Sequence, residues 1–265
     1  MKAIIAGEES AARRAVLLIA VLALWLVAFL PTWRDWLHLC LSDPQYEQGP
    51  ILAVLGILIA GYRLFRLPDR ALAPRPMDAS VLVIGALAWV VAWLAGVSAL
   101  QQLLVVFSGL ALVGATLGRS AAGAAVLPLA LFLTASEGWE HAAVPLQRLT
   151  AAAVGAALPW FGVPVFVEAN HVVVPAGEFV IEQGCAGVKY VMIMLAVAIL
   201  SIAVRGLTVR ARALLLVLAF ALALVANWVR VGAVIYVGQV THLQHPWVQW
   251  WARVRPIRSP ARPRR

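Results

Sequence analysis

Long apolar runs separated by short arginine-rich segments constrain this chain more than any other feature. Of its 265 residues, 63% are hydrophobic and only 12% are charged, and the mean hydropathy is +0.90. A soluble globule cannot bury that much apolar surface, whereas a bilayer accommodates apolar helices of about 20 residues. The sequence therefore predicts an all-α polytopic membrane protein whose main surroundings are the lipid bilayer.

Seven apolar runs are candidates for membrane helices. They cover residues 15–30, 50–62, 80–97, 100–117, 121–135, 188–204 and 213–240. The first run follows Arg13 and Arg14 without a small-residue cleavage site, so we expect an uncleaved helix rather than a signal peptide. About seven transmembrane helices in a single domain, residues 1–265, are expected.

The positions of the arginines predict how these helices are oriented across the membrane. The segments 63–75 and 205–212 are rich in arginine, whereas residues 31–49 carry three acidic residues and one arginine. Because arginine-rich loops stay on the cytoplasmic side, we expect residues 31–49 to be an outer loop. The formal charge of +9 lies largely in such loops, so nucleic acid is not an expected partner.

The segment 136–184 is expected outside and differs from the other connections. Residues 142–160 predict an interfacial or re-entrant helix with Trp139 and Trp160 as anchors. Three β-branched runs broken by turn residues then predict a small extracytoplasmic β-hairpin that leads to Cys185. They cover residues 163–168, 171–175 and 178–182.

One polar stretch, Glu182-Gln-Gly-Cys185-Ala-Gly-Val-Lys189-Tyr, places a thiol at the start of a membrane helix. Lys189 follows Cys185 by four residues and shares its helix face. Its ammonium group and the helix N-terminus are therefore expected to lower the pKa of the thiol and activate it. An inert packing cysteine is the alternative.

Asn227 and Arg230 are polar residues within the last apolar run. An arginine at the centre of a bilayer costs roughly 2.5–3.5 kcal/mol, so it needs a partner, water or a function. Arg230 lies 17 residues beyond Ala213, or about 26 Å, which puts it near the outer boundary where Cys185 is also expected. Amide, guanidinium and thiol are predicted to converge there, whereas a snorkelling arginine is the alternative.

Glu182-x-x-Cys185-x-Gly187, followed by Asn227-x-x-Arg230 and a histidine beyond the helix, resembles the bacterial exosortase family, the EpsH-like exosortases and archaeosortases. The resemblance covers most of the chain. It implies a membrane-embedded cysteine transpeptidase or thiol protease that cuts C-terminal PEP-CTERM-type sorting signals from exported proteins. It also implies a role in exopolysaccharide and envelope biogenesis, at the bacterial inner membrane with the site facing the periplasm.

The resemblance also implies a role for each motif residue. Cys185 matches the nucleophile that forms an acyl-thioester, and Arg230 matches the arginine that stabilises charge or assists proton transfer. Glu182, Lys189 and Asn227 match supporting or substrate-binding positions. No cofactor or metal is implied, and the chain has no P-loop, HExxH or CxxC motif.

The histidine of the family pattern has more than one candidate. His242 fits the local spacing best and is the expected catalytic base, His245 is an alternative, and His171 on the hairpin is the next candidate. A third reading is that the family histidine has been lost. The tail, residues 252–265, is atypical because arginine and proline stand where the family has a further helix. A truncated or frame-shifted tail and a tail that folds back both account for it.

Non-enzymatic classes fit the composition as well. In a membrane transporter or an exopolysaccharide-assembly component, Glu182, Lys189 and Arg230 would line a polar pathway. A membrane acyl- or glycosyltransferase is a further alternative. Cys185→Ser separates these classes, because it abolishes a cysteine peptidase and largely spares a transporter.

Overall fold

The structure is a computed structural model that describes residues 2–68, 76–244 and 254–255, with the backbone alone for residues 2–14, 76–79 and 254–255. It is mostly helical. The chain forms two compact units. Unit 1 comprises Met1–Gly138 and Leu195–Leu216, and unit 2 comprises Trp139–Met194 and Val217–Arg265.

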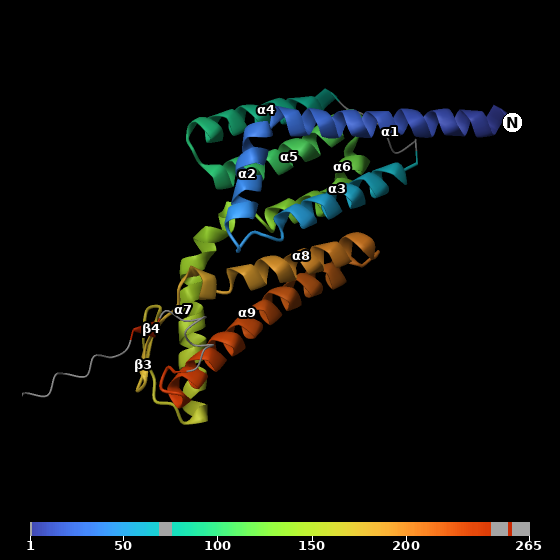
Figure 1. Ribbon diagram of the computed structural model, residues 1–265. Helices are drawn as coiled ribbons and strands as arrows, with labels where there is room; N and C mark the ends of the chain where they lie inside the picture. The colour runs from blue at the N-terminus through green and yellow to red at the C-terminus, as the bar shows by residue number, and fades with distance from the viewer. Residues whose placement is uncertain (1, 69–75, 245–253, 256–265) are drawn as a thin grey trace, which may run out of the picture. The chain divides into compact units, whose positions relative to one another are not determined.

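Helices build most of unit 1. They are α1 (Lys2–Ala28), α2 (Leu30–Ser42), α3 (Gly49–Phe65), α4 (Pro76–Leu94), α5 (Ser98–Leu117) and α6 (Arg119–Leu133). Helices α4, α5, α6 and α3 lie side by side in that order (Figure 1), and α1 and α2 both contact α5 and α3. These helices occur where apolar runs were predicted, with the exception of α2.

The expectation of a loop over residues 31–49 is wrong, because Leu30–Ser42 forms helix α2. Pro31 does not prevent this helix, since the first turn contains N–H groups that have no helical partner. Trp36 and Cys40 are four residues apart and are both buried, so they form one packed face. A bend of 80° separates α2 from α1.

Aromatic side chains fill the junction of α1, α2 and α6. The Trp25 and Trp33 rings meet edge to face with 4.7 Å between centroids, and Phe132 contacts Trp25, Trp33 and Trp36. Contacts of this kind add about 0.5–1.5 kcal/mol each beyond area burial. The Trp36 Nε1–H also donates to the Ala135 carbonyl at 2.8 Å. Packing and hydrogen bonding together hold α2 against the end of α6.

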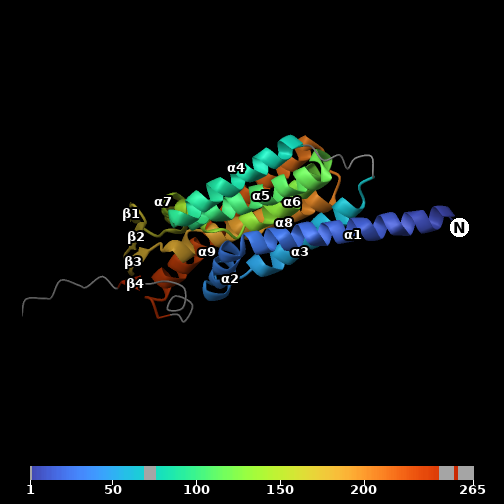
Figure 2. The same cartoon turned by 90° about the horizontal axis from the view of Figure 1, so that it is seen from above.

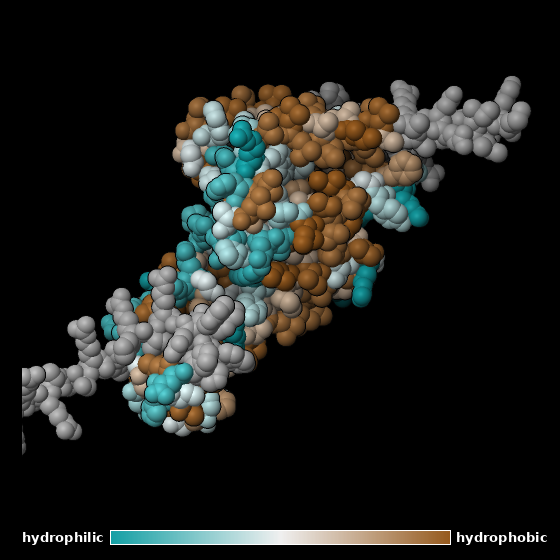
Figure 3. Space-filling model, in the orientation of Figure 1, coloured by the Kyte–Doolittle hydropathy of each residue, from teal (hydrophilic) through white to brown (hydrophobic). Residues whose placement is uncertain are grey.

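Two described helices, α5 and α9 (Val209–Val240), are long and apolar enough to cross a membrane. Each of two bent pairs, α1 with α2 and α6 with Glu137–Phe161, would add one span. Three shorter apolar helices, Gly49–Phe65, Ser80–Leu94 and Val188–Val204, fall in the remaining expected spans. Figure 3 shows much apolar surface over α1, α3 and α4. Two to four candidate spans are therefore supported, and seven stays a prediction.

Unit 2 combines helix α7 (Glu140–Ala157) with a small sheet and with parts of α8 (Val188–Val204) and α9. The strands pair antiparallel in the order β1-β2-β3-β4 (Figure 2). They are β1 (Phe166–Glu168), β2 (His171–Val174), β3 (Gly177–Val180) and β4 (Val254–Arg255). The predicted hairpin is confirmed in β2 and β3. The rest of the tail 252–265 lies outside the described residues.

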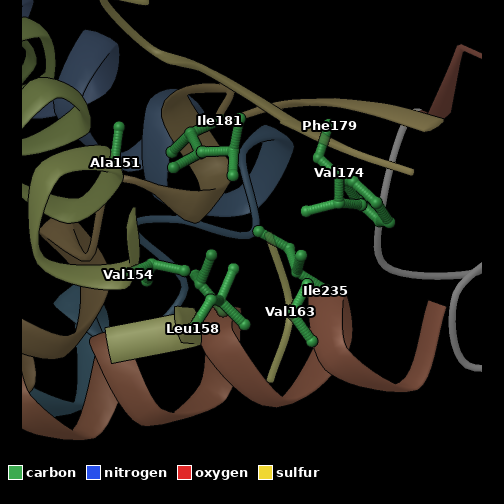
Figure 4. Packing of buried hydrophobic residues seen from close by; sticks show 10 residues of the cluster. Ala151, Val154, Leu158, Val163, Val174, Phe179, Ile181 and Ile235 are labelled. Carbon is green, nitrogen blue, oxygen red and sulfur yellow. The ribbon is translucent and has the colours of Figure 1, made fainter. Parts of the chain in front are cut away.

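The inner face of the hairpin packs against α7 and α9. Val174 and Phe179 project from the strands into the same buried cluster as Val154 of α7 and Ile235 of α9, and Ile181 continues this face beyond β3 (Figure 4). Burying each such side chain stabilises the fold by about 1.5–3 kcal/mol. This core fixes the segment that leads from β3 to Cys185.

Candidate active site

Cys185 closes a short turn, η4 (Gln183–Cys185), between β3 and α8. Its N–H donates to the Glu182 carbonyl at 2.9 Å. Gly187 then adopts a left-handed φ of +92°, which favours glycine. Because α8 begins at Val188, the thiol lies next to a helix N-terminus, whose partial positive charge favours anions.

Two fully buried side chains hold this turn from α7 and α9. The Nδ2 of Asn227 donates to the Cys185 carbonyl at 3.0 Å and to Thr150 Oγ1 at 3.3 Å. The Thr150 hydroxyl in turn donates to the Ala186 carbonyl at 3.4 Å. Gly187 packs so closely on Asn227 that a Cβ there would lie 2.9 Å from the Asn227 Cγ. Asn227 and Thr150 therefore position the backbone around the thiol.

The Arg230 guanidinium contacts both the thiol and an aromatic ring. It donates a hydrogen bond to the Cys185 sulfur, and its Cζ lies 5.8 Å from the centroid of the Tyr190 ring. A cation over an aromatic face gains about 0.5–2 kcal/mol. The structure thus brings Cys185, Asn227 and Arg230 together.

Burial raises the pKa of the Cys185 thiol above its ordinary value. The charge and the hydrogen bond of Arg230 oppose this rise, and the Glu182 carboxylate adds to it. The net direction is opposite to the sequence-based expectation, because loss of hydration disfavours the thiolate more than the nearby cation favours it. The thiol is therefore protonated at neutral pH and needs a base to become a nucleophile.

A cavity of about 30 Å³ lies beside the thiol. Besides Cys185 and Arg230 it is lined by residues at or just beyond the end of β3 and within α9, namely Phe179, Val180, Ile181, Val231, Val234 and Ile235. A water molecule needs roughly 10–15 Å³ of such space, so one or two waters fit. Ligand sites usually exceed about 300 Å³. The cavity is therefore too small for a ligand of peptide size unless it opens.

The structure does not bring His242 to the thiol. Helix α9 ends at Val240, ten residues beyond Arg230, which is about 15 Å along its axis. His242 follows in a turn with φ +50°, and its side chain is exposed. The Nδ1 of His171 lies 2.6 Å from Glu178 Oε1, and the β2–β3 register puts this pair on the face opposite the Phe179 core.

The remaining expected residues flank the thiol. Glu182 is exposed and acts on the thiol by its charge, and Lys189 is half-buried in the first turn of α8. His245 lies outside the described residues. Among the described residues, no group of three or more His, Cys, Asp or Glu side chains could hold a metal ion.

Sequence reasoning missed Thr150 and Tyr190. Thr150 precedes a run of small apolar residues and belongs to no motif, so the sequence offers no signal for it. Tyr190 ends the polar stretch around the cysteine. An aromatic residue near an intramembrane arginine is a recognisable cation–π signal.

No curated protein and no solved structure matches this chain. The family model of the transmembrane exosortases (Exosortase_EpsH) matches residues 8–253, nearly the whole length. The matched range contains Cys185, Asn227 and Arg230, the three residues that the structure brings together. The chain therefore belongs to the transmembrane exosortase family.

Proposed function

We propose that this protein is a membrane-embedded cysteine transpeptidase or protease that cleaves C-terminal PEP-CTERM-type sorting signals of exported proteins. Membership of the exosortases, a family of cysteine transpeptidases, supports the reaction class. The observation that carries the proposal is the hydrogen bond between the Arg230 guanidinium and the Cys185 sulfur at the start of α8. A positive group next to a thiol at a helix N-terminus is suited to acyl transfer.

The proposal extends to the location of the protein. We expect seven helices to cross the bacterial inner membrane as one domain, residues 1–265, with Cys185 on the periplasmic side. The arginine-rich segments 63–75 and 205–212 support this orientation, since such loops stay in the cytoplasm. The family resemblance supports a role in exopolysaccharide and envelope biogenesis.

In the proposed reaction, a base takes the thiol proton and the Cys185 sulfur attacks the scissile carbonyl. A C–S bond forms, and the carbonyl oxygen becomes an oxyanion that the α8 N-terminus and Arg230 stabilise. The C–N bond then breaks and the amine leaves with a proton, so an acyl-thioester remains on Cys185. Water or an amine releases the acyl group.

His242 is the proposed base. Its exposed position beyond the end of α9 means that this segment must approach the thiol during the reaction. His171 is the alternative base, because Glu178 orients its imidazole. The raised pKa of Cys185 makes a base necessary at neutral pH.

Co-expression with a tagged exported protein that ends in a PEP-CTERM tail tests the proposal. We expect the parent protein to shorten this substrate and Cys185→Ser to leave it intact. Cys40→Ala is the matched control, because Cys40 is buried in unit 1. An uncleaved substrate with the parent protein, at normal expression and membrane insertion, would reject the proposal and favour the transporter class.

A further inference from the structure

Unit 1 contains a large apolar groove that has no part in the proposed reaction. Its volume is about 510 Å³, and residues of α1, α3, α5 and α6 line it. Representative lining residues are Leu18, Leu22, Leu58, Phe65, Leu112 and Leu129. This volume falls in the range of about 300–1,000 Å³ that small-molecule sites occupy.

The length of the groove matches one leaflet of a bilayer. Its lining residues on α1 run from Ala15 to Trp25, which is about 15 Å at 1.5 Å per residue. The hydrocarbon core of a bilayer is about 30 Å thick, so one leaflet is about 15 Å. Ala15 directly follows Arg13 and Arg14, which marks this end as cytoplasmic. The groove thus has the length of an acyl chain in the cytoplasmic leaflet.

Two arginines lie at the same end of the groove, Arg63 in the last turn of α3 and Arg66 directly after it. Tyr62 lines the groove, and the Arg66 Cζ lies 5.0 Å from the centroid of its ring. The Nη1 of Arg63 is buried and has no hydrogen-bond partner within the described part of the chain. Because Arg63 and Arg66 are three residues apart, they are neighbours on the helix surface and can hold one phosphate between them.

We propose that an anionic phospholipid of the cytoplasmic leaflet binds to this groove, with an acyl chain against α1 and α3 and its phosphate at Arg63 and Arg66. The apolar lining accepts the chain, and the guanidinium groups select the head group. Each arginine near an anionic membrane surface raises the binding affinity roughly fivefold. The pair should therefore favour an anionic over a zwitterionic lipid by roughly 25-fold.

Lipid retention by the purified protein tests this site. Detergent-solubilised protein is mixed with equal amounts of phosphatidylglycerol and phosphatidylcholine, washed, and its bound lipid is quantified by mass spectrometry. The parent should retain phosphatidylglycerol, and the double variant Arg63→Ala, Arg66→Ala should lose this preference. Gly61 lines the groove, and a Cβ there meets nothing within 4 Å, so a leucine side chain can enter the groove without disturbing the packing. Gly61→Leu should therefore fill the groove and lose the lipid.

Gly123→Leu is the matched control, since Gly123 also has open space at its Cβ and does not line the groove. It should retain lipid like the parent. Equal retention by the parent and Gly61→Leu would overturn the site, and an unchanged preference in the double arginine variant would overturn the phosphate contact. Cross-linking of a photoreactive phosphatidylglycerol to Leu18 or Leu58 is expected, and cross-links confined to other helices would overturn the site. No substrate is needed, so this result and the cleavage result are independent.

Discussion

Replacing Gly187 with alanine should disable the active site without unfolding the protein. The φ of +92° at this position costs a residue with a Cβ about 1–2 kcal/mol. The added Cβ would lie 2.9 Å from the Cγ and Nδ2 of Asn227 and 3.1 Å from its Cβ. Such crowding costs about 1–3 kcal/mol. The total of about 2–5 kcal/mol exceeds the ~1 kcal/mol of a single hydrogen bond, so Asn227 should release the Cys185 carbonyl.

Cleavage of the tagged substrate measures this effect. A loss of 2 kcal/mol from the transition state corresponds to about 30-fold in rate, so Gly187→Ala should be at least about 30-fold slower. Gly184→Ala is the matched control in the same turn, because a Cβ there meets nothing within 4 Å and its φ is not left-handed. Gly184→Ala should keep full activity. A fully active Gly187→Ala would refute the idea that the close approach to Asn227 positions the thiol.

Further predictions concern the positioning threonine, the thiol and the base. Thr150→Val removes the hydroxyl that donates to the Ala186 carbonyl, and an unsatisfied buried carbonyl costs about 1–3 kcal/mol. Cleavage by this variant should fall about tenfold or more. Thr150→Ser keeps the hydroxyl, and its activity should stay near that of the parent. Because burial raises the pKa of Cys185, its alkylation should accelerate as pH rises through and above neutrality. Arg230→Gln removes a charge that lowers this pKa, so alkylation should be slower at each pH in that range; a faster reaction would contradict the sign. His242→Ala should abolish cleavage, because His242 is the proposed base. If His171→Ala loses activity and His242→Ala does not, the base is His171.

The helices were predictable where an apolar run is bounded by residues that end helices. Helix α5, Ser98–Leu117, stops at Gly118, which adopts φ +95°. Helix α2 was not predictable, because Pro31, Asp35 and Asp43 together have the composition of an outer loop. What makes it helical is the packing of its tryptophans on the end of α6, about a hundred residues later, and no local pattern contains that contact.

The meeting of Cys185 with Asn227 and Arg230 was predictable from expected depth alone, since two apolar runs of opposite expected direction placed them at the same expected membrane boundary. The direction of the thiol pKa was not predictable. It depends on how β3 and α9 exclude water around the sulfur, which is a property of tertiary packing. The role of Thr150 was not predictable for the same reason, because it depends on tertiary hydrogen bonds with Asn227 and Ala186.

The indole rings of unit 1 are close enough to couple electronically. Trp25 and Trp33 are 4.7 Å apart, Trp33 and Trp36 are 6.0 Å apart, and Trp89 and Trp93 stack at 6.3 Å with 17° between their planes. Coupled chromophores give a signed circular-dichroism couplet that disappears when the rings separate. All five rings belong to unit 1, whereas Cys185 belongs to unit 2. Because Cys40 belongs to unit 1, the Cys40→Ala variant leaves Cys185 as the thiol to be labelled. In that variant, loss of the couplet reports the unfolding of unit 1 and labelling of Cys185 reports the opening of unit 2, in one sample.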